Sequence, residues 1–397
     1  MLTGWMALAF ASAPSTALPQ VPLSKSNPIS EELSSVAQLL EKNQTAQGLQ
    51  AAESFARQHA SQADPLLQLG SLLARHAQHE QAAKAFAQAN QLRPHNADVL
   101  YNLGVAYYYS HNLAPAAAAL AESADLDAKP AETHFSLALV AVEQGDHQNA
   151  VIELQHSLQR DPHRADYAAL LGQECGKVGY WQGAVTAYRE AARLEPTQAL
   201  HWLHLGDALL RSNEVPAAIE ALEQAEHLDP ALPEVNFLLG FACQTAGQWE
   251  RAAEYYQRQL EKTPDHLETL VNAGVVAVER DRLPEADIFL HHALARDPEN
   301  VQANFERGLL LYKNRDYEQA IPALKHVLWL RPDHTQAEYY FYLALSKTHQ
   351  DEAAGAALAQ WKKLEALDRK IRAQEVAYGA AREARWPPGG SAAAPTP

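Results

Sequence analysis

Residues 199–232 read ALHWLHLGDALLRSNEVPAAIEALEQAEHLDPAL, and this stretch carries the pattern that decides the fold. Apolar residues from Trp202 onward recur at the three- to four-residue spacing of a helix face, and a second such set follows from Ala218. Asn213, between the two sets, is a residue type that tolerates the left-handed backbone conformation at the end of a helix. Pro230 stops the second set, because proline has no N–H to donate. The stretch therefore predicts two helices joined by a short turn.

The same pattern returns every 34 residues, in three columns of residues. Glycines fill one column, at 70, 104, 172, 206, 240, 274 and 308, and Ala138 stands in its one vacant place. Alanines fill a second column at 82, 116, 150, 184, 218, 252, 286, 320 and 354. Prolines fill a third at 94, 162, 196, 230, 264, 298 and 332. Chance does not keep three residue types in phase over such a length, so the chain is predicted to be a repeat protein.

The small residues have a packing reason. Two antiparallel helices approach most closely where neither carries a bulky side chain, and Gly206 and Ala218 would mark that crossing. With Leu205, Leu222 and Pro230 at the expected spacings, the unit resembles the tetratricopeptide repeat, and the resemblance covers residues 63–368. It implies an all-α fold: a right-handed superhelical solenoid of stacked antiparallel helix pairs, with a concave groove lined by the first helices.

The ends of the chain differ from the repeats. Leu2–Ala11 is apolar and small residues follow it, as in a secretory signal peptide, but no positive charge precedes this run. The protein is therefore expected to be exported, periplasmic or secreted, with a cytoplasmic protein and a disordered leader as the alternative. The predicted organisation is a leader at 1–30, a degenerate helical cap at 31–62, eight units at 63–334, a ninth, degenerate unit at 335–368, a capping helix at 369–386 and a disordered tail at 387–397.

Composition excludes several classes of function. The net charge of -16 argues against binding the phosphate backbone of a nucleic acid, and no apolar run has the length of a membrane span. Cys175 and Cys243 occupy the same slot in units separated by one whole unit, so they are predicted to be buried and unbridged.

No catalytic motif is present, so no cofactor, metal or enzymatic activity is predicted. The strongest metal-ligand pattern is His201, His204 and Asp207, which step by three along one helix. A metal site needs three or four convergent ligands, and ordinary polar surface is the preferred interpretation of these residues.

A second stripe on the first helices predicts a binding groove. The groove is expected to have an aromatic floor and an acidic rim, because these slots face the groove in the family that the chain resembles. The floor comprises Tyr101, Tyr108, Phe135, Phe237, Phe241, Phe305, Tyr312 and Tyr339. The rim comprises Asp98, Glu132, Asp166, Glu234 and Glu268. The alternatives are contacts between neighbouring first helices for the aromatic residues, and favourable interaction with the helix dipole for the acidic ones.

These observations favour a non-catalytic protein–protein interaction scaffold whose partner is a protein or peptide with apolar and basic side chains. The alternative is a non-catalytic subunit or a regulatory peptide receptor of an enzyme complex, similar to the repeats that precede some glycosyltransferases. The C-terminal helical stretch carries seven Lys or Arg against four Asp or Glu between residues 361 and 386. This basic helix is expected to be a cap, with a partner site as the second interpretation.

Overall fold

The computed structural model describes residues 28–126 and 129–383, with side chains as far as residue 374. The tail predicted at 387–397 and all but three residues of the leader predicted at 1–30 lie outside the described residues. The described residues form helices joined by short turns, and they contain no strand. Among them, no helix is both long enough and apolar enough to cross a lipid bilayer.

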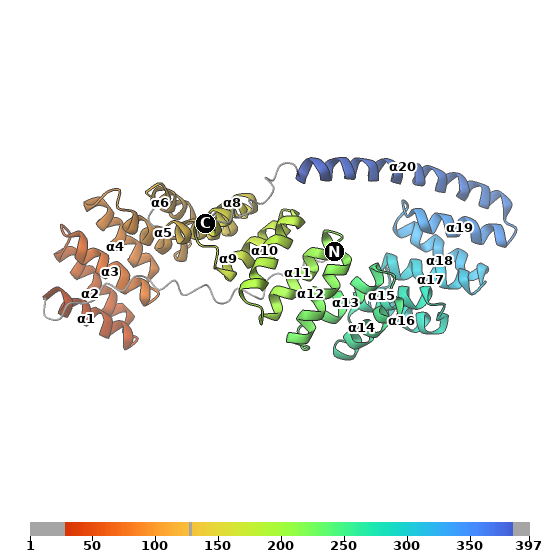
Figure 1. Cartoon of the computed structure of the whole chain (residues 1–397), viewed down its shortest axis with the longest axis horizontal. Coiled ribbons are helices and arrows are strands. Elements are labelled where there is room, and N and C mark those ends of the chain that lie inside the picture. Colours follow the sequence, from red (N-terminus) through yellow and green to blue (C-terminus); the bar gives the residue numbers. More distant parts are fainter. Residues whose placement is uncertain (1–27, 127–128, 384–397) are drawn as a thin grey trace, which may run out of the picture. The chain divides into compact units, whose positions relative to one another are not determined.

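The chain divides into two compact units, residues 1–174 and 175–397 (Figure 1). The first unit contains α1 (Pro28–Glu41), α2 (Thr45–Gln58), α3 (Ala63–Arg75), α4 (His79–Leu92), α5 (Ala97–Tyr109), α6 (Leu113–Asp125), α7 (Pro130–Glu143) and α8 (His147–Arg160). Helix α9 (Ala165–Lys177) runs across the boundary. The second unit contains α10 (Trp181–Leu194), α11 (Ala199–Arg211), α12 (Val215–Leu228), α13 (Val235–Thr245), α14 (Trp249–Lys262), α15 (Leu267–Glu279), α16 (Leu283–Arg296), α17 (Val301–Lys313), α18 (Tyr317–Leu330), α19 (Thr335–Lys347) and α20 (Asp351–Glu383).

Successive helices pack as pairs, and the predicted crossing point is confirmed. A Cβ atom added to Gly206 in α11 would lie 2.5 Å from Leu222 Cγ and 3.4 Å from the carbonyl oxygen of Ala218, both in α12. Gly104 stands in the same relation to Leu120 and Ala116 in the pair α5–α6. Glycine is thus needed in this column because the partner helix occupies the place of a side chain.

The turns inside the pairs adopt the predicted backbone conformation. Asn213, the turn residue named from the sequence, has a φ angle of 64°. The same place in other pairs is held by Gly145, Gly179, Gly247 and Asp281, with φ from 57° to 74°. In the α11–α12 turn, the N–H group of Glu214 donates to the carbonyl oxygen of Leu209 at 2.8 Å, so the last turn of the first helix keeps its hydrogen bonds.

The two ends of the array differ from the predicted boundaries. Helix α1 begins at Pro28, and α1 and α2 pack together as one more helix pair. At the other end, α20 is a single helix of 33 residues that includes both the second helix of the ninth unit and the separate capping helix predicted at 369–386. Nothing breaks the helix between them, because the sequence there contains neither a proline nor a turn-forming glycine.

Buried polar and sulfur-containing side chains also occupy repeat positions. Cys175 and Cys243 are buried and unbridged, as the sequence predicts. Ser123 and Ser157 stand in the same repeat slot, and their hydroxyl groups donate to the carbonyl oxygens of Ala97 and Ala131 at 2.9 and 2.7 Å. Each bond ties the second helix of a pair to the start of its first helix.

Candidate partner-binding surface

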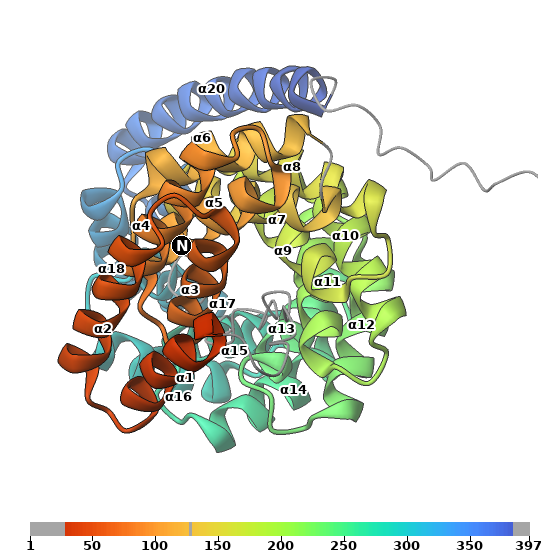
Figure 2. The same ribbon diagram turned by 90° about the vertical axis from the view of Figure 1, so that its left-hand side faces the viewer.

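The first helices form the inner face of each unit. Within the first unit, α3 packs on α5 and α5 on α7; within the second, the same holds for α11, α13, α15, α17 and α19 in succession. Figure 2 shows the second helices, such as α4, α6 and α8 in the first unit, on the outer side of these rows. The helices that form the inner face are therefore the ones that carry the predicted floor residues.

Half of the predicted aromatic floor is buried between helices. Tyr101, Phe135, Phe237 and Phe305 expose only 3–5% of their surface. Phe135 stacks on Tyr167 with ring centroids 3.9 Å apart, and the other three also have aromatic or basic neighbours. These four side chains hold neighbouring first helices together, which is the alternative role given above for the aromatic floor residues.

The other half of the floor remains partly accessible. Phe241 is 39% exposed and lies one helical turn beyond Phe237, with ring centroids 6.4 Å apart. Tyr108, Tyr312 and Tyr339 are intermediate in exposure. Burial is the main reason that the pKa of Tyr108 rises to about 12, so this phenol stays neutral and can donate a hydrogen bond over the physiological pH range.

Most of the acidic rim has basic neighbours within the chain. Asp98 lies 3.8 Å from the Nζ atom of Lys129, and Asp166 pairs with Arg164 at 2.7 Å. Glu132 is partly exposed in the first turn of α7. Asp98 and Asp166 therefore combine a favourable position at a helix start with local ion pairing, whereas Glu132 has the favourable position alone among these observations.

The rim of the second unit is different. Glu234 does not lie inside α13 but directly before it, in the left-handed conformation with φ of 64°. Its Oε2 atom lies 3.4 Å from His266 Nε2, which is also 3.6 Å from the Glu268 carboxylate. Burial is the main cause of a raised pKa at Glu234, with Glu268 adding to the rise and His266 opposing it. Two carboxylates thus share one imidazole beside Phe237, whose ring is 5.3 Å from that of His266.

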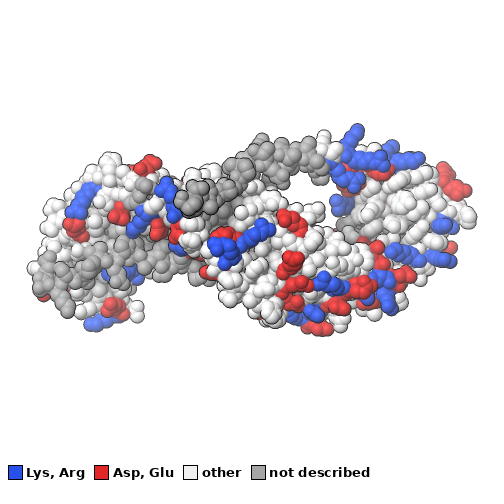
Figure 3. Space-filling model, in the orientation of Figure 1, with Lys and Arg blue, Asp and Glu red and all other residues white. Residues whose placement is uncertain are grey.

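Charges on the second helices are more evenly balanced. Figure 3 shows acidic and basic side chains interspersed over the visible face of the second unit. Arg258 of α14 pairs with Glu226 of α12 at 3.2 Å, and Arg296 of α16 pairs with Asp265 at 3.0 Å. Glu234 differs from these exposed carboxylates, because it is partly desolvated and its pKa is raised.

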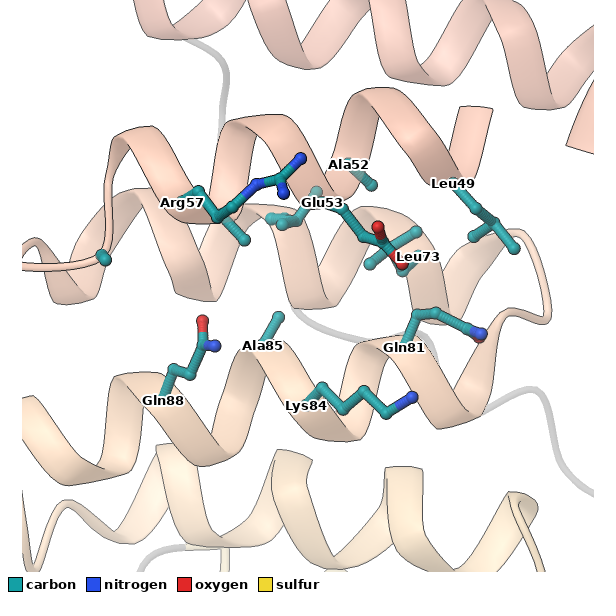
Figure 4. Close-up of a pocket in the computed structure, with 12 residues that line it drawn as sticks. Leu49, Ala52, Glu53, Arg57, Leu73, Gln81, Lys84, Ala85 and Gln88 are labelled. Atoms are coloured by element: carbon teal, nitrogen blue, oxygen red, sulfur yellow. The ribbon is translucent and has the colours of Figure 1, made fainter. Parts of the chain in front are cut away.

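The structure also contains a groove that the sequence did not reveal. It lies between α2 and α4, over α3, and has a volume of about 320 Å³. Figure 4 shows Arg57, Glu53 and Lys84 around it, with Ala52 and Leu73 among the apolar residues. Because α2 is out of register with the repeats, the sequence pattern gave no indication that its face would leave this space.

Comparisons with known proteins agree with this architecture. One family model, described as tetratricopeptide repeat, matches residues 67–133, 101–165, 170–233 and 289–333, and a second model of the same description matches 237–268. No curated protein matches the chain.

Solved structures with a similar fold have low sequence identity. A MamA structure from Desulfovibrio magneticus is 18% identical, covers 43% of this chain and 96% of its own, and gives a TM-score of 0.41. YrrB, described as a TPR protein with an unusual peptide-binding site, is 17% identical. The match covers 49% of this chain and 98% of YrrB, with a TM-score of 0.42. A chain of the APC/C hetero-tetramer Cut9–Hcn1 is 17% identical, and the match covers 79% of this chain and 63% of that one with a TM-score of 0.45.

Proposed function

The chain belongs to the tetratricopeptide repeat family, and on that premise we propose that it is a scaffold that binds a segment of a partner protein on the inner face of its second unit. Members of this repeat family typically serve as interaction scaffolds, and no catalytic family is indicated for this chain. The partner segment carries large apolar side chains and at least one Lys or Arg.

The observation that carries this proposal is the combination of Phe241 with Glu234 and Glu268. Phe241 offers exposed aromatic surface, and exposed aromatic side chains often mark binding sites. Glu234 is held half-buried beside a second carboxylate, which raises its pKa and makes its charged form costly. A Lys or Arg side chain from a partner would offset that cost through a charge-assisted hydrogen bond.

The four buried aromatic residues take a supporting role in this proposal. Phe237 and Phe305 keep the first helices in place, whereas Phe241, Tyr312 and Tyr339 supply contact surface in the second unit. Tyr108 would do the same in the first unit. Exposed rim charges would mainly speed association and lose their effect as salt rises, while the aromatic contacts hold most of the affinity.

A selection from a random peptide library on the full chain tests the proposal. We expect the selected peptides to be enriched in large apolar residues together with Lys or Arg. Phe241→Ala should weaken their binding by about 1–2 kcal/mol or more, and Glu234→Gln should weaken peptides with Lys or Arg more than peptides without them. Trp329→Ala is the control, because Trp329 is 70% exposed but lies on the second helix α18. Equal binding by Phe241→Ala and the wild type, or selection of acidic peptides, would refute the proposal.

We also propose that the protein is exported. The apolar run Leu2–Ala11 and the small residues after it support this, although they lie outside the described residues. Sequencing the N-terminus of the protein from its native cells tests it. A start near Ser12 or Leu18 is expected, and an intact Met1 on the cytoplasmic protein would contradict export.

A further inference from the structure

Three potential metal ligands converge at one end of the helix pair α7–α8. They are His134 on α7 and Glu153 and His156 on α8, and one ligand atom of each lies within 4.8 Å of the other two. Among the described residues, no other three His, Cys, Asp or Glu side chains bring one ligand atom each within 4.8 Å of both others. We propose that these residues form a binding site for a divalent transition metal ion of the Zn²⁺ type.

Local helix geometry brings the ligands together. Glu153 and His156 are three residues apart on α8, so they lie on the same helix face. His134 faces them from α7: its Nδ1 atom is 2.7 Å from Glu153 Oε2, and its ring meets that of His156 edge to face at 5.1 Å. In a tetrahedral zinc site the ligand atoms are roughly 3.3 Å apart, as bond lengths near 2.0–2.1 Å require. Side-chain rotations that move the ligand atoms by about 1 Å would therefore bring them to this spacing.

The helix pair holds the ligands in place before any ion binds. The hydroxyl group of Ser157, next to His156, donates to the carbonyl oxygen of Ala131 at 2.7 Å and ties α8 to the start of α7. The side chains of His134 and Glu153 are only 17% and 26% exposed, which restricts their rotamers. His156 is exposed, so a metal ion can enter from solvent.

The repeat pattern indicates that this chemistry is specific to one unit. Glu153 stands in a slot that is apolar in the other eight units: alanine in six, Tyr255 and Phe289 in two. His134 stands in a slot where no other unit has a histidine. Two ligand-type residues thus replace the usual ones at positions that face each other in the same helix pair.

The ligand set determines what the site can do. Two imidazoles and one carboxylate suit Zn²⁺ and neighbouring transition metals, and Ca²⁺ or Mg²⁺ would require more oxygen ligands. Three protein ligands leave a fourth tetrahedral position open to water or to a group on a partner. The site lies between a first and a second helix of the first unit and shares no residue with the partner surface proposed for the second unit, so the two proposals are independent.

Titration of the metal-free full chain with Zn²⁺, without a histidine tag, tests the proposal. Isothermal calorimetry should detect one equivalent that binds more tightly than any other. Glu153→Gln, which keeps the shape of the side chain and removes its charge, and His156→Ala should each weaken that equivalent at least tenfold, since even changes to groups behind the ligands cost 10- to 100-fold. Zn²⁺ should also raise the melting temperature of the wild type more than that of either variant.

The control is His95→Gln. His95 pairs with Glu122 at 3.0 Å but belongs to no group of three ligands, so this variant should bind Zn²⁺ like the wild type. Co²⁺ provides a second measurement, because its visible absorption spectrum reports the coordination geometry and should change in both site variants. The proposal is overturned if both site variants bind Zn²⁺ like the wild type, or if His95→Gln loses as much affinity as they do.

Discussion

Replacing Gly206 by alanine tests the helix crossing on which the repeat is built. The new Cβ atom would lie 2.5 Å from Leu222 Cγ and 2.6 Å from Leu222 Cδ2, closer than such atoms approach in proteins. Leu222 is completely buried and cannot move aside without disturbing the core of the second unit. Overpacking of this kind costs about 1–3 kcal/mol, and the better helix propensity of alanine returns about 1 kcal/mol.

Gly355→Ala is the control that separates the cost of overpacking from the gain in helix propensity. Gly355 also lies inside a helix, α20, but an added Cβ atom there meets no other atom within 4 Å. This variant should gain up to about 1 kcal/mol, so the difference in unfolding free energy between the two variants should be about 1–3 kcal/mol. Urea unfolding followed by far-ultraviolet circular dichroism measures it.

A double-mutant cycle identifies the atoms that clash. Leu222→Ala alone should cost about 2–5 kcal/mol, but it also makes room for a Cβ atom at position 206. The double variant should then be more stable than the sum of the two single losses predicts. Equal stability of Gly206→Ala and Gly355→Ala, together with additive losses in the cycle, would refute the crossing as described.

Three further predictions concern buried groups. Burial is the main cause that raises the pKa of Glu306 from 4.5 to about 7, so the unfolded chain loses this proton at lower pH than the folded one. The free energy of unfolding should therefore fall as pH rises from 4.5 to about 7. Above this range Glu306→Gln should be more stable than the wild type by on the order of 3 kcal/mol, and urea unfolding that shows the same pH slope for both proteins would contradict this. Ser157→Ala should cost about 1 kcal/mol, since it removes the buried hydrogen bond to the Ala131 carbonyl oxygen; an unchanged melting curve would contradict a stabilising role for this bond. Thiol titration of the unfolded protein should find both Cys175 and Cys243 free after oxidative purification, and a smaller number would indicate a disulfide.

The helix pairs and their turns could be predicted from the sequence because their determinants are local and repeated. Gly206 and Ala218 occupy columns that recur in almost every unit, and a close crossing is the common reason for small residues at both. Asn213 could be identified as a turn residue because few residue types adopt positive φ without strain, and Gly247 takes the same place in a later unit.

The exposure of the groove residues could not be predicted in the same way. Phe237 and Phe241 lie on the same stripe of one helix, yet the first is 5% exposed and the second 39%. The difference depends on neighbours from other pairs, such as His266, which the spacing within one unit does not specify. Glu234 likewise differs from the other rim residues: it has a left-handed backbone conformation and lies before α13 instead of in its first turn, which the repeat pattern does not specify.

The cluster of His134, Glu153 and His156 could not be predicted from spacing along single helices, because its ligands come from two helices. His201, His204 and Asp207 do have such a spacing, but His201 is hydrogen-bonded to Glu195 at 3.1 Å and Asp207 to Arg211. The cluster on α7 and α8 needs two helices. Comparison of the same slots across the units would have revealed it, because Glu153 is the one charged residue in its column.

Photo-crosslinking of a selected peptide to the full chain tests the proposed function most directly. A peptide with a photoreactive group next to its Lys or Arg should label α13 and α15, near Phe241 and Glu268, and the yield should fall in Phe241→Ala. Labelling of the groove between α2 and α4, or of α18 around Trp329, with none on α13 or α15, would contradict the proposal that the inner face of the second unit holds the partner.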